Sequence, residues 1–586
     1  MLFRSVKSLP QITISGYMTF GQAIQGPVAG SNYYGLRDSL SVTRGKHSIK
    51  FGIDASLEKF IQDTSLNNYG VWSFDGKKTG NALADFLTGV PASFKQDTPA
   101  TKIDDDWYAG LYVQDDWRIL PRLTLNLGLR YEMPMSMTDP LNRKMTFAPG
   151  VQSTVAPNAP AGLLFPGDNG VGRGIFSAPH KFFAPRLGLA WDPFGDGRTS
   201  IRASGGIFYG SISSNNMNMT TDYQPFSARQ TFANVKTLAD PYGNMGGSPF
   251  PISYNPKNIL FLLKPSDVST IATNFHFPYT YQFNFSVQRQ VRKDLSVTSA
   301  YVGTLSHHLP FTVDKNYAGW TPGATTANLP NRRPYLPGTL GIIYYEDGII
   351  NSDYHGLQNT VEKRMSHGFT LRGFYTFAKS MEGAQSQNNQ PTGGAEDFRN
   401  LALERAPTNS NRRHVANVSA IWEMNYFHGA PALRQAFNGW TVSAIGTARS
   451  GTPLTFTTGT DTNVDGNSTD RVDIIGNPKL DASRSRSDVT NAWFNTAAFA
   501  APATGADGNS SRNLIDGPGA KWVDIGLFRK FKLKELMNLE FRAEMTNALN
   551  LVNLGSPATG RNSTTFGKIT SAGGMRQTQL GLRLAW

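Results

Sequence analysis

A short acidic segment, DTNVDGNSTD at 461–470, has the spacing of an EF-hand-type calcium loop. Oxygen-bearing side chains on alternate residues can converge on one cation when Gly466, at the sixth position, lets the chain fold back. The bidentate acid of the twelfth position is missing, because Val472 stands there. The predicted metal ligands are Asp461, Asn463, Asp465 and Asp470. The alternative is a solvated polar loop without a cation, and the sequence leaves both open.

Arginines recur on the polar side of several stretches in which apolar and polar residues alternate. If the apolar side faces lipid, the polar side lines an interior lumen. The arginines predicted to line this lumen are Arg122, Arg130, Arg202, Arg542 and Arg583. Glu132, Glu540 and Glu544 occupy the same kind of position, so we expect at least half of the arginines to form ion pairs across strands. The alternative is an interior that attracts anions.

Other chemistry has little support in the sequence. There is no GxSxG, HExxH or Walker pattern and no cysteine. Acidic runs at 104–106 and 115–116 flank a predicted strand, where solvation of the strand ends explains them. We therefore expect no enzymatic activity, and no cofactor other than calcium at 461–470. The net charge of +13 comes without a dense run of lysine and arginine, so nucleic acid is not an expected partner.

The composition favours one large β architecture. Glycine and proline supply 58 and 34 of the 586 residues, and charged residues only 17%, which describes a turn-rich and charge-poor chain. The longest purely apolar run, 259–263, is far shorter than the roughly 20 residues of a membrane-spanning helix. A bundle of membrane helices is therefore excluded.

Alternation with a period of two runs for longer than in most globular strands. Leu123, Leu125 and Leu127 alternate with polar residues, and the pattern returns at 539–546 and 579–586. Each such stretch has one apolar and one polar face. About sixteen windows, most of them 9 to 12 residues long, are predicted to be strands; they begin near residues 11, 36, 47, 107, 123, 185, 198, 281, 295, 355, 369, 413, 439, 522, 539 and 580.

Short and long connections alternate between these strands. Tight turns such as 45–46 and 367–368 alternate with long segments such as 134–183 and 451–520. An up-and-down meander of this kind places all its long loops at one end, which is typical of outer-membrane barrels. A propeller would show a fixed repeat, a sandwich shorter strands, and a soluble barrel an apolar interior. We predict an all-β, antiparallel, up-and-down transmembrane β-barrel.

Five segments resemble the barrel of TonB-dependent outer-membrane receptors, in particular the Oar-like subgroup. They are YVQDDWRILPRLTLNLGLRYE (112–132), FFAPRLGLAWDPFGDGRTSIRASGGIFYG (182–210), GWTVSAIGTARSGTPLTF (439–456), EFRAEMTNALNLVNLGSPA (540–558) and FGKITSAGGMRQTQLGLRLAW (566–586). The resemblance implies a barrel of about 22 strands in the bacterial outer membrane, with an N-terminal plug and a TonB box. Residues 1–586 are then expected to be an incomplete barrel domain that lacks the plug, the TonB box and the signal peptide.

Two functions agree with this resemblance. The first is TonB-dependent transport of a solute too large for porins, in which this chain lines the channel and presents the outer loops. The alternative is a surface-interaction or adhesion protein without transport. The implied partners are outer-membrane lipid, the barrel-assembly machinery, an unidentified solute, and the TonB complex acting through the missing plug. In this family the last strand is also an assembly signal, whose pattern is supplied here by Leu580, Leu582, Leu584 and Trp586.

Overall fold

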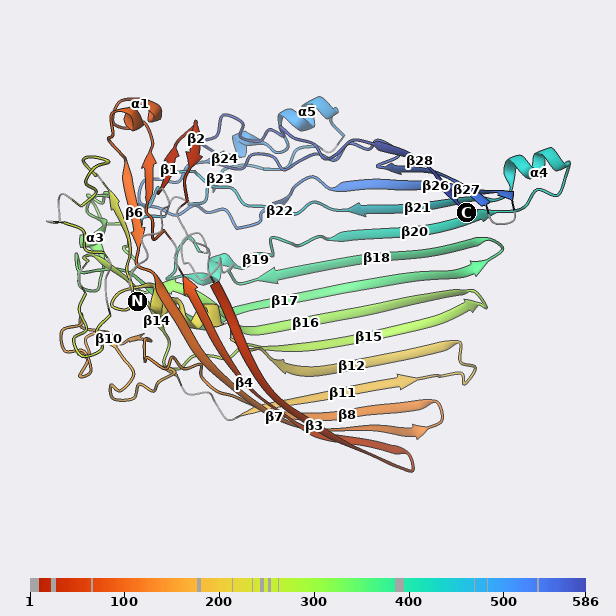
Figure 1. Cartoon of the computed structure of the whole chain (residues 1–586), viewed down its shortest axis with the longest axis horizontal. Helices are drawn as coiled ribbons and strands as arrows, with labels where there is room; N and C mark the ends of the chain where they lie inside the picture. The colour runs from red at the N-terminus through yellow and green to blue at the C-terminus, as the bar shows by residue number, and fades with distance from the viewer. Residues whose placement is uncertain are drawn as a thin grey trace.

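The computed structural model describes residues 10–586 except 23–27, 65–66, 177–180, 213, 234, 243–246, 251–253, 262, 385–394, 468–469, 482 and 535–536. Its main feature is one large, strongly curved sheet, with the long loops at one end and the tight turns at the other (Figure 1). Its long strands follow one another in chain order and are all antiparallel to their neighbours, which confirms the predicted all-β, up-and-down architecture. They are β3 (Val28–Arg44), β4 (His47–Thr64), β7 (Ala100–Leu120), β8 (Leu123–Pro134), β11 (Phe182–Trp191), β12 (Thr199–Tyr209), β15 (Tyr279–Arg292), β16 (Leu295–Asp314), β17 (Leu340–Ser366), β18 (Phe369–Glu382), β20 (His414–Met424), β21 (Trp440–Arg449), β26 (Ala520–Lys534), β27 (Met537–Thr546) and β28 (Gln577–Ala585).

The long loops fold into smaller elements at one end of the sheet (Figure 1). A five-stranded sheet of order β13-β6-β5-β1-β2 packs with α1 around Trp72 and Phe74. None of the described helices is long and apolar enough to cross a membrane. The loop elements are β1 (Gln11–Ile14), β2 (Met18–Phe20), β5 (Val71–Phe74), α1 (Ala82–Leu87), β6 (Ser93–Asp97), β9 (Thr146–Phe147), β10 (Leu163–Leu164), α2 (Ser214–Met217), η1 (Met219–Asp222), β13 (Arg229–Ala233), β14 (Ser266–Ile271), α3 (Leu329–Arg332), η2 (Leu401–Glu404), β19 (Ala406–Pro407), β22 (Pro453–Leu454), β23 (Asp473–Ile474), α5 (Arg486–Asn491), η3 (Thr496–Ala498), β24 (Phe499–Ala500) and β25 (Ile515–Asp516); α4 (Pro431–Phe437) lies at the opposite, tight-turn end.

The outer face of the sheet is apolar because successive residues of a strand point to opposite faces. Leu125 and Leu127 of β8 lie opposite Leu189 and Leu187 of β11, so leucines form continuous rows across strands. Leu187 is 61% exposed, an arrangement that suits lipid and not water. On β28, the leucines at 580, 582 and 584 continue the apolar row of β27. The registers place the leucines of β8 and β28 on one face of the sheet, as their alternation with polar residues predicts.

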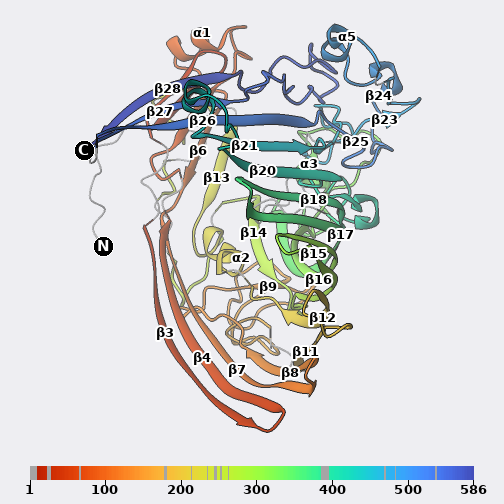
Figure 2. The same ribbon diagram turned by 90° about the vertical axis from the view of Figure 1, so that its right-hand side faces the viewer.

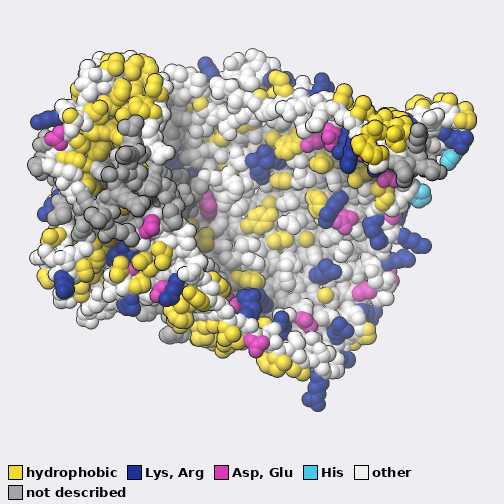
Figure 3. All heavy atoms as spheres, viewed as in Figure 1, with side chains coloured by type: hydrophobic (Ala, Val, Ile, Leu, Met, Phe, Trp, Pro, Cys, Tyr) yellow, Lys and Arg dark blue, Asp and Glu magenta, His cyan; other side chains and the backbone are white. Residues whose placement is uncertain are grey.

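The polar face looks into the hollow of the sheet, where Figure 3 shows charged side chains scattered among uncharged and hydrophobic ones. Lys102 and Asp104 of β7 lie on the same face as Tyr108, and loop residues cover them. The Nζ of Lys102 lies 2.7 Å from Asp222, and Asp104 lies 2.9 Å from the Nζ of Lys144. Figure 2 shows the neighbouring α2 inside the curve of the sheet. These contacts identify the polar face as the inner one.

The strands differ from the sequence prediction in number and in length. The large sheet has fifteen long strands within the described residues, because the window at Gln11 forms β1 of the small sheet. Eight of these fifteen strands exceed 12 residues, and β17 has 27. The N-terminal part of β17, residues 340–346, pairs in parallel with β14 and so supports the loops.

The sheet does not close within the described residues. β28 has a ladder with β27, and β3 has one with β4, but no ladder joins β28 to β3, and Figure 2 shows the gap between them. Both edge strands are open on both faces; Leu582 is 72% and Tyr33 is 64% exposed. Fourteen antiparallel ladders separate the two edges, so β3 and β28 run in the same direction.

Candidate functional site

A charged network crosses the inner wall on β3, β4, β7 and β8. The Nε of Arg130 lies 3.0 Å from Oε1 of Glu132, and its Nη2 lies 3.4 Å from Oδ2 of Asp54. Asp54 also accepts a hydrogen bond of 2.9 Å from Arg37, and Arg130 donates to the hydroxyl of Tyr108. The pairs with Asp54 cross from strand to strand, as the alternating charges predict, whereas Arg130 and Glu132 are two residues apart on β8. Its geometry fixes the Arg130 side chain against the wall.

The other predicted lumen arginines have different surroundings. Arg542 lies 2.7 Å from Glu540, whereas Arg583 is exposed on the edge strand and Arg202 lines a polar hollow of about 440 Å³ near the tight turns. The prediction for Arg122 is wrong, because β8 begins at Leu123 and Arg122 stands in the turn before it. Within the described residues, two of the five arginines form ion pairs, fewer than the expected half.

The acidic runs lie within β7 and do not flank it as expected, and solvation alone does not explain them. Asp104 is only 1% exposed and pairs with the equally buried Lys144. Asp115 lies 2.6 Å from Nδ1 of His47, whose ring stacks on Trp117. The expectation of solvated strand ends is therefore wrong for Asp104, since distant loop residues fold over it. A single sequence gives no signal of such a long-range partner.

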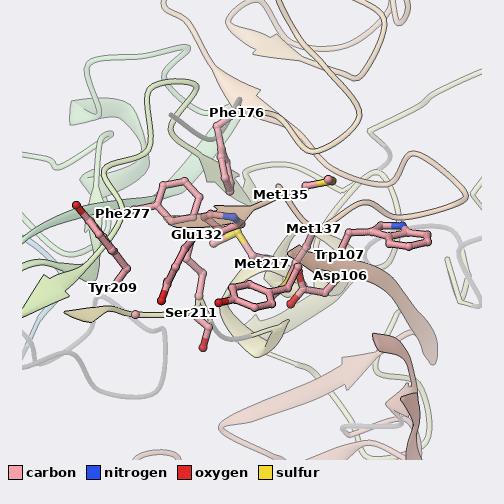
Figure 4. A pocket seen from close by; sticks show the side chains of 14 residues that line it. Asp106, Trp107, Glu132, Met135, Met137, Phe176, Tyr209, Ser211, Met217 and Phe277 are labelled. Carbon is pink, nitrogen blue, oxygen red and sulfur yellow. The ribbon is translucent and has the colours of Figure 1, made fainter. Parts of the chain in front are cut away.

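A cavity of about 300 Å³ lies where β7, β8 and β12 meet the loops (Figure 4). Its wall is largely apolar and aromatic, with Tyr209, Met217 and Phe277 among the lining residues, and it carries the carboxyl groups of Asp106 and Glu132. Such a lining suits an organic group that offers hydrogen-bond donors. The sequence did not indicate this cavity, because its residues come from six separate segments of the chain.

The predicted calcium segment brings most of its acids together. Carboxylate oxygens of Asp461, Asp465 and Asp470 lie within 4.8 Å of one another. Asp461 accepts hydrogen bonds from the backbone N–H groups of Asp465 and Gly466, at 3.0 and 2.9 Å, so the chain folds back at the glycine as predicted. Asn463 differs from its predicted role as a metal ligand, since its amide nitrogen donates hydrogen bonds to Asp507 at 2.7 Å and to Asp465 at 3.2 Å.

Two of the three clustered acids are buried, which does not fit a fully solvated loop, whereas Asp461 is half-buried and Gly466 is exposed. Asp465 and Asp470 are 8% and 1% exposed. Burial, together with the neighbouring Asp470 and Asp461, raises the pKa of Asp465 to about 6, and burial also raises the pKa of Asp470. Within the described part of the chain, none of these three carboxylates forms an ion pair with a basic side chain. The site therefore concentrates negative charge without an internal counter-charge.

A second buried cluster holds the same loop against η2. Arg471 pairs through Nε with Glu396, at 2.8 Å, and through Nη1 with Glu404. Arg512 lies 2.9 Å from Glu382 at the end of β18. Burial raises the pKa of Glu396 to about 7, against the attraction of Arg471. These contacts anchor the 451–520 loop to the wall of the sheet.

An apolar outer face, a charged inner face and long loops at one end define the class of outer-membrane β-barrel proteins. The chain matches the family model of the outer membrane beta barrel domain over residues 3–579, and it belongs to that family. Its location is the outer membrane of a bacterium.

Three comparisons describe what the chain is similar to. It is 25% identical to the TonB-dependent transporter Oar of Myxococcus xanthus over 220 residues, which are 36% of this chain and 17% of the relative. The structure of the outer membrane transporter YddB from Escherichia coli matches with a TM-score of 0.51 and 10% identity over 99% of this chain and 58% of that chain. The structure of the siderophore receptor PiuA from Acinetobacter baumannii matches with a TM-score of 0.43 and 10% identity, over 95% of this chain and 56% of that chain. This chain thus spans little more than half the length of these structures.

Proposed function

We propose that this chain forms the channel wall and outer loops of a TonB-dependent transporter for a solute too large for porins. The observation that carries the proposal is the inner wall, where Arg37, Asp54, Arg130 and Glu132 present a polar surface beneath folded loops. Such a surface offers hydrogen-bonding groups to a passing solute, while the aromatic cavity beside β7 offers a place to hold it. The Oar relative, itself a TonB-dependent transporter, supports the same reading. TonB, the assembly machinery and membrane lipid are the proposed partners.

The directions of the edge strands support a role as part of a larger barrel. A closed sheet in which every neighbour is antiparallel needs an even number of strands. β3 and β28 run the same way, so an odd number of strands must fill the gap between them. A barrel of about 22 strands, as the resemblance implies, would need about seven more. Seven is odd, in agreement with the directions observed.

Crosslinking tests how the gap is filled. The chain contains no cysteine, so introduced pairs report specific contacts. Leu582→Cys with Phe541→Cys, which are register partners, should form a disulfide in the assembled protein and serves as the positive control. Leu582→Cys with cysteines placed singly at 33 to 37 of β3 should form none if further strands intervene. A disulfide between β28 and β3 would contradict the larger barrel.

Transport is tested in the native host by comparing the solutes depleted from the medium by wild-type cells, a deletion mutant and a mutant without TonB energy coupling. If the protein is a transporter, the uptake of at least one solute should be lost in both mutants. Loss of cell or surface attachment in the deletion mutant, with uptake unchanged, would overturn the proposal in favour of an adhesion function.

A further inference from the structure

We propose that the acidic segment 461–470 binds one calcium ion, with Asp461, Asp465 and Asp470 as its carboxylate ligands. Their carboxylate oxygens already lie within 4.8 Å of one another, so little movement is needed to place all three around a cation. The chain turns back at Gly466, where a φ of 96° favours glycine. The inference is independent of transport.

A buried carboxylate oxygen without a hydrogen-bond partner supports a cation at this position. One carboxylate oxygen of Asp470, Oδ2, accepts hydrogen bonds from Thr462 and from the backbone of Asn463. The other oxygen, Oδ1, is buried and has no hydrogen-bond partner in the described part of the chain. Burying a carboxylate oxygen without a partner is destabilising, because its hydration is lost and nothing replaces it. A cation at this position would satisfy it.

The nearby basic residues do not neutralise the three carboxylates. Arg471, next in the chain, is engaged by Glu396 and Glu404. Arg332 approaches the segment, but its guanidinium donates to the backbone carbonyl of Val464. Carboxylates this close repel one another strongly in a buried setting. A divalent cation bound between the three carboxylates would attract each of them and so offset their mutual repulsion.

The donor set selects the ion. Within the described residues, the cluster contains carboxylates and no histidine, and the chain has no cysteine, so zinc and other soft metals are disfavoured. Calcium accepts carboxylate oxygens, backbone carbonyls and water in flexible geometry, whereas magnesium demands a near-ideal octahedron. Asn463 acts as a positioning residue, because its amide holds Asp465 and Asp507.

The ion would fasten two loops together. The segment contacts Tyr317 through Asn463 and α3 through Arg332, and both belong to the loop that follows β16. Its own loop returns to the wall at β26, and Figure 1 shows β22 and β23, which flank the segment, at the loop end of the sheet. Calcium at this position would therefore stabilise the seam between the 315–339 and 451–520 loops.

The test uses the full chain in detergent micelles after removal of metals with EDTA. Binding is measured by titration calorimetry with calcium chloride, and loop stability by limited proteolysis of the 451–520 loop with and without calcium. Wild type should bind one calcium ion per chain and gain at least fivefold protection from protease. Asp470→Asn and Asp461→Asn should each weaken binding at least tenfold and lose the protection.

Asp516→Asn is the matched control, because Asp516 is an exposed carboxylate in the same loop outside the cluster. It should bind calcium as wild type does. Asp461 is only half-buried, so its asparagine variant keeps the test valid if Asp470→Asn fails to fold. No calcium-dependent heat or protection in wild type would overturn the proposal, as would wild-type affinity in a folded Asp461→Asn variant.

Discussion

The guanidinium Nη1 of Arg471 lies 2.8 Å from Oε1 and 2.9 Å from Oε2 of Glu404, and the pair is buried. Glu404 ends η2, whereas Arg471 lies in the 451–520 loop that precedes β26. The same arginine reaches Glu396 through Nε. One side chain thus joins two loops that are far apart in sequence.

Removing Glu404 should loosen the 451–520 loop strongly. Glu404→Ala leaves Arg471 buried with half of its pairing lost, and breaking a buried ion pair costs about 3–5 kcal/mol. Amide hydrogen exchange in the loop should accelerate while exchange in β15 and β16 stays slow. Leu403→Ala is the control, because Leu403 is 54% exposed next to Glu404. Equal exchange in wild type and Glu404→Ala would show that the pair does not hold the loop.

The same cluster predicts a pH dependence through Glu396. Burial raises the pKa of Glu396 from its ordinary value near 4.5 to about 7. Because the folded-state pKa is raised, this group stabilises the loop fully below about pH 4.5, and that stability is lost as the pH rises through about 7. With calcium chelated throughout, proteolysis of the loop should quicken as the pH rises from about 4.5 through about 7.

Glu396→Gln removes one titrating group and should reduce that pH dependence, while Asp465 and Asp470, whose pKa values burial also raises, keep the remainder. Asp516→Asn, in the same loop but exposed, should keep the wild-type profile. A glutamine variant that retains the full pH dependence would place its origin in another group.

The two faces of β15 predict opposite effects of an added charge. Phe285, near the middle of the strand, is on the outer face and 49% exposed, whereas Gln282 is on the inner face. Phe285→Arg should cost about 2–4 kcal/mol because the charge enters the bilayer. Gln282→Arg faces the lumen and should be tolerated. Heat-modifiable mobility on gels would measure the folded fraction of each variant in outer membranes, and equal folding of the two would contradict the assigned faces.

The strands could be predicted from the sequence because their signal is local. Period-two alternation places Leu123, Leu125 and Leu127 on one face whatever the strand pairs with, and the structure has them there. The ends of the strands were harder to predict, since Arg122 continues the alternation but stands in the turn. The pattern records which side of the chain is apolar, and it does not record where the ladder of hydrogen bonds begins.

The site could be predicted only where one segment supplies it. The acids of 461–470 lie within ten residues, and their spacing was enough to bring three of them together. The ion pair of Asp104 with Lys144 and the cavity beside Glu132 depend on how the loops fold back into the sheet. Hydrophobic periodicity carries no information about such contacts, so neither could be predicted from the sequence.

The C-terminal residue is predicted to act in assembly more than in stability. Trp586 follows β28, and its side chain is 88% exposed, so it buries little surface in the folded chain. If it served only as an interfacial anchor, its loss would cost on the order of 1–3 kcal/mol in the finished barrel. A residue read by the assembly machinery would instead limit how much protein is inserted.

In a complete receptor with this C-terminus, Trp586→Ala or a short added tail should lower the inserted amount several-fold, whereas Trp586→Phe should be tolerated. Met575→Ala, at a loop residue that is 80% exposed, is the control and should insert normally. Heat-modifiable mobility measures insertion, and equal amounts of the alanine, phenylalanine and tailed forms would leave Trp586 as an ordinary interfacial residue.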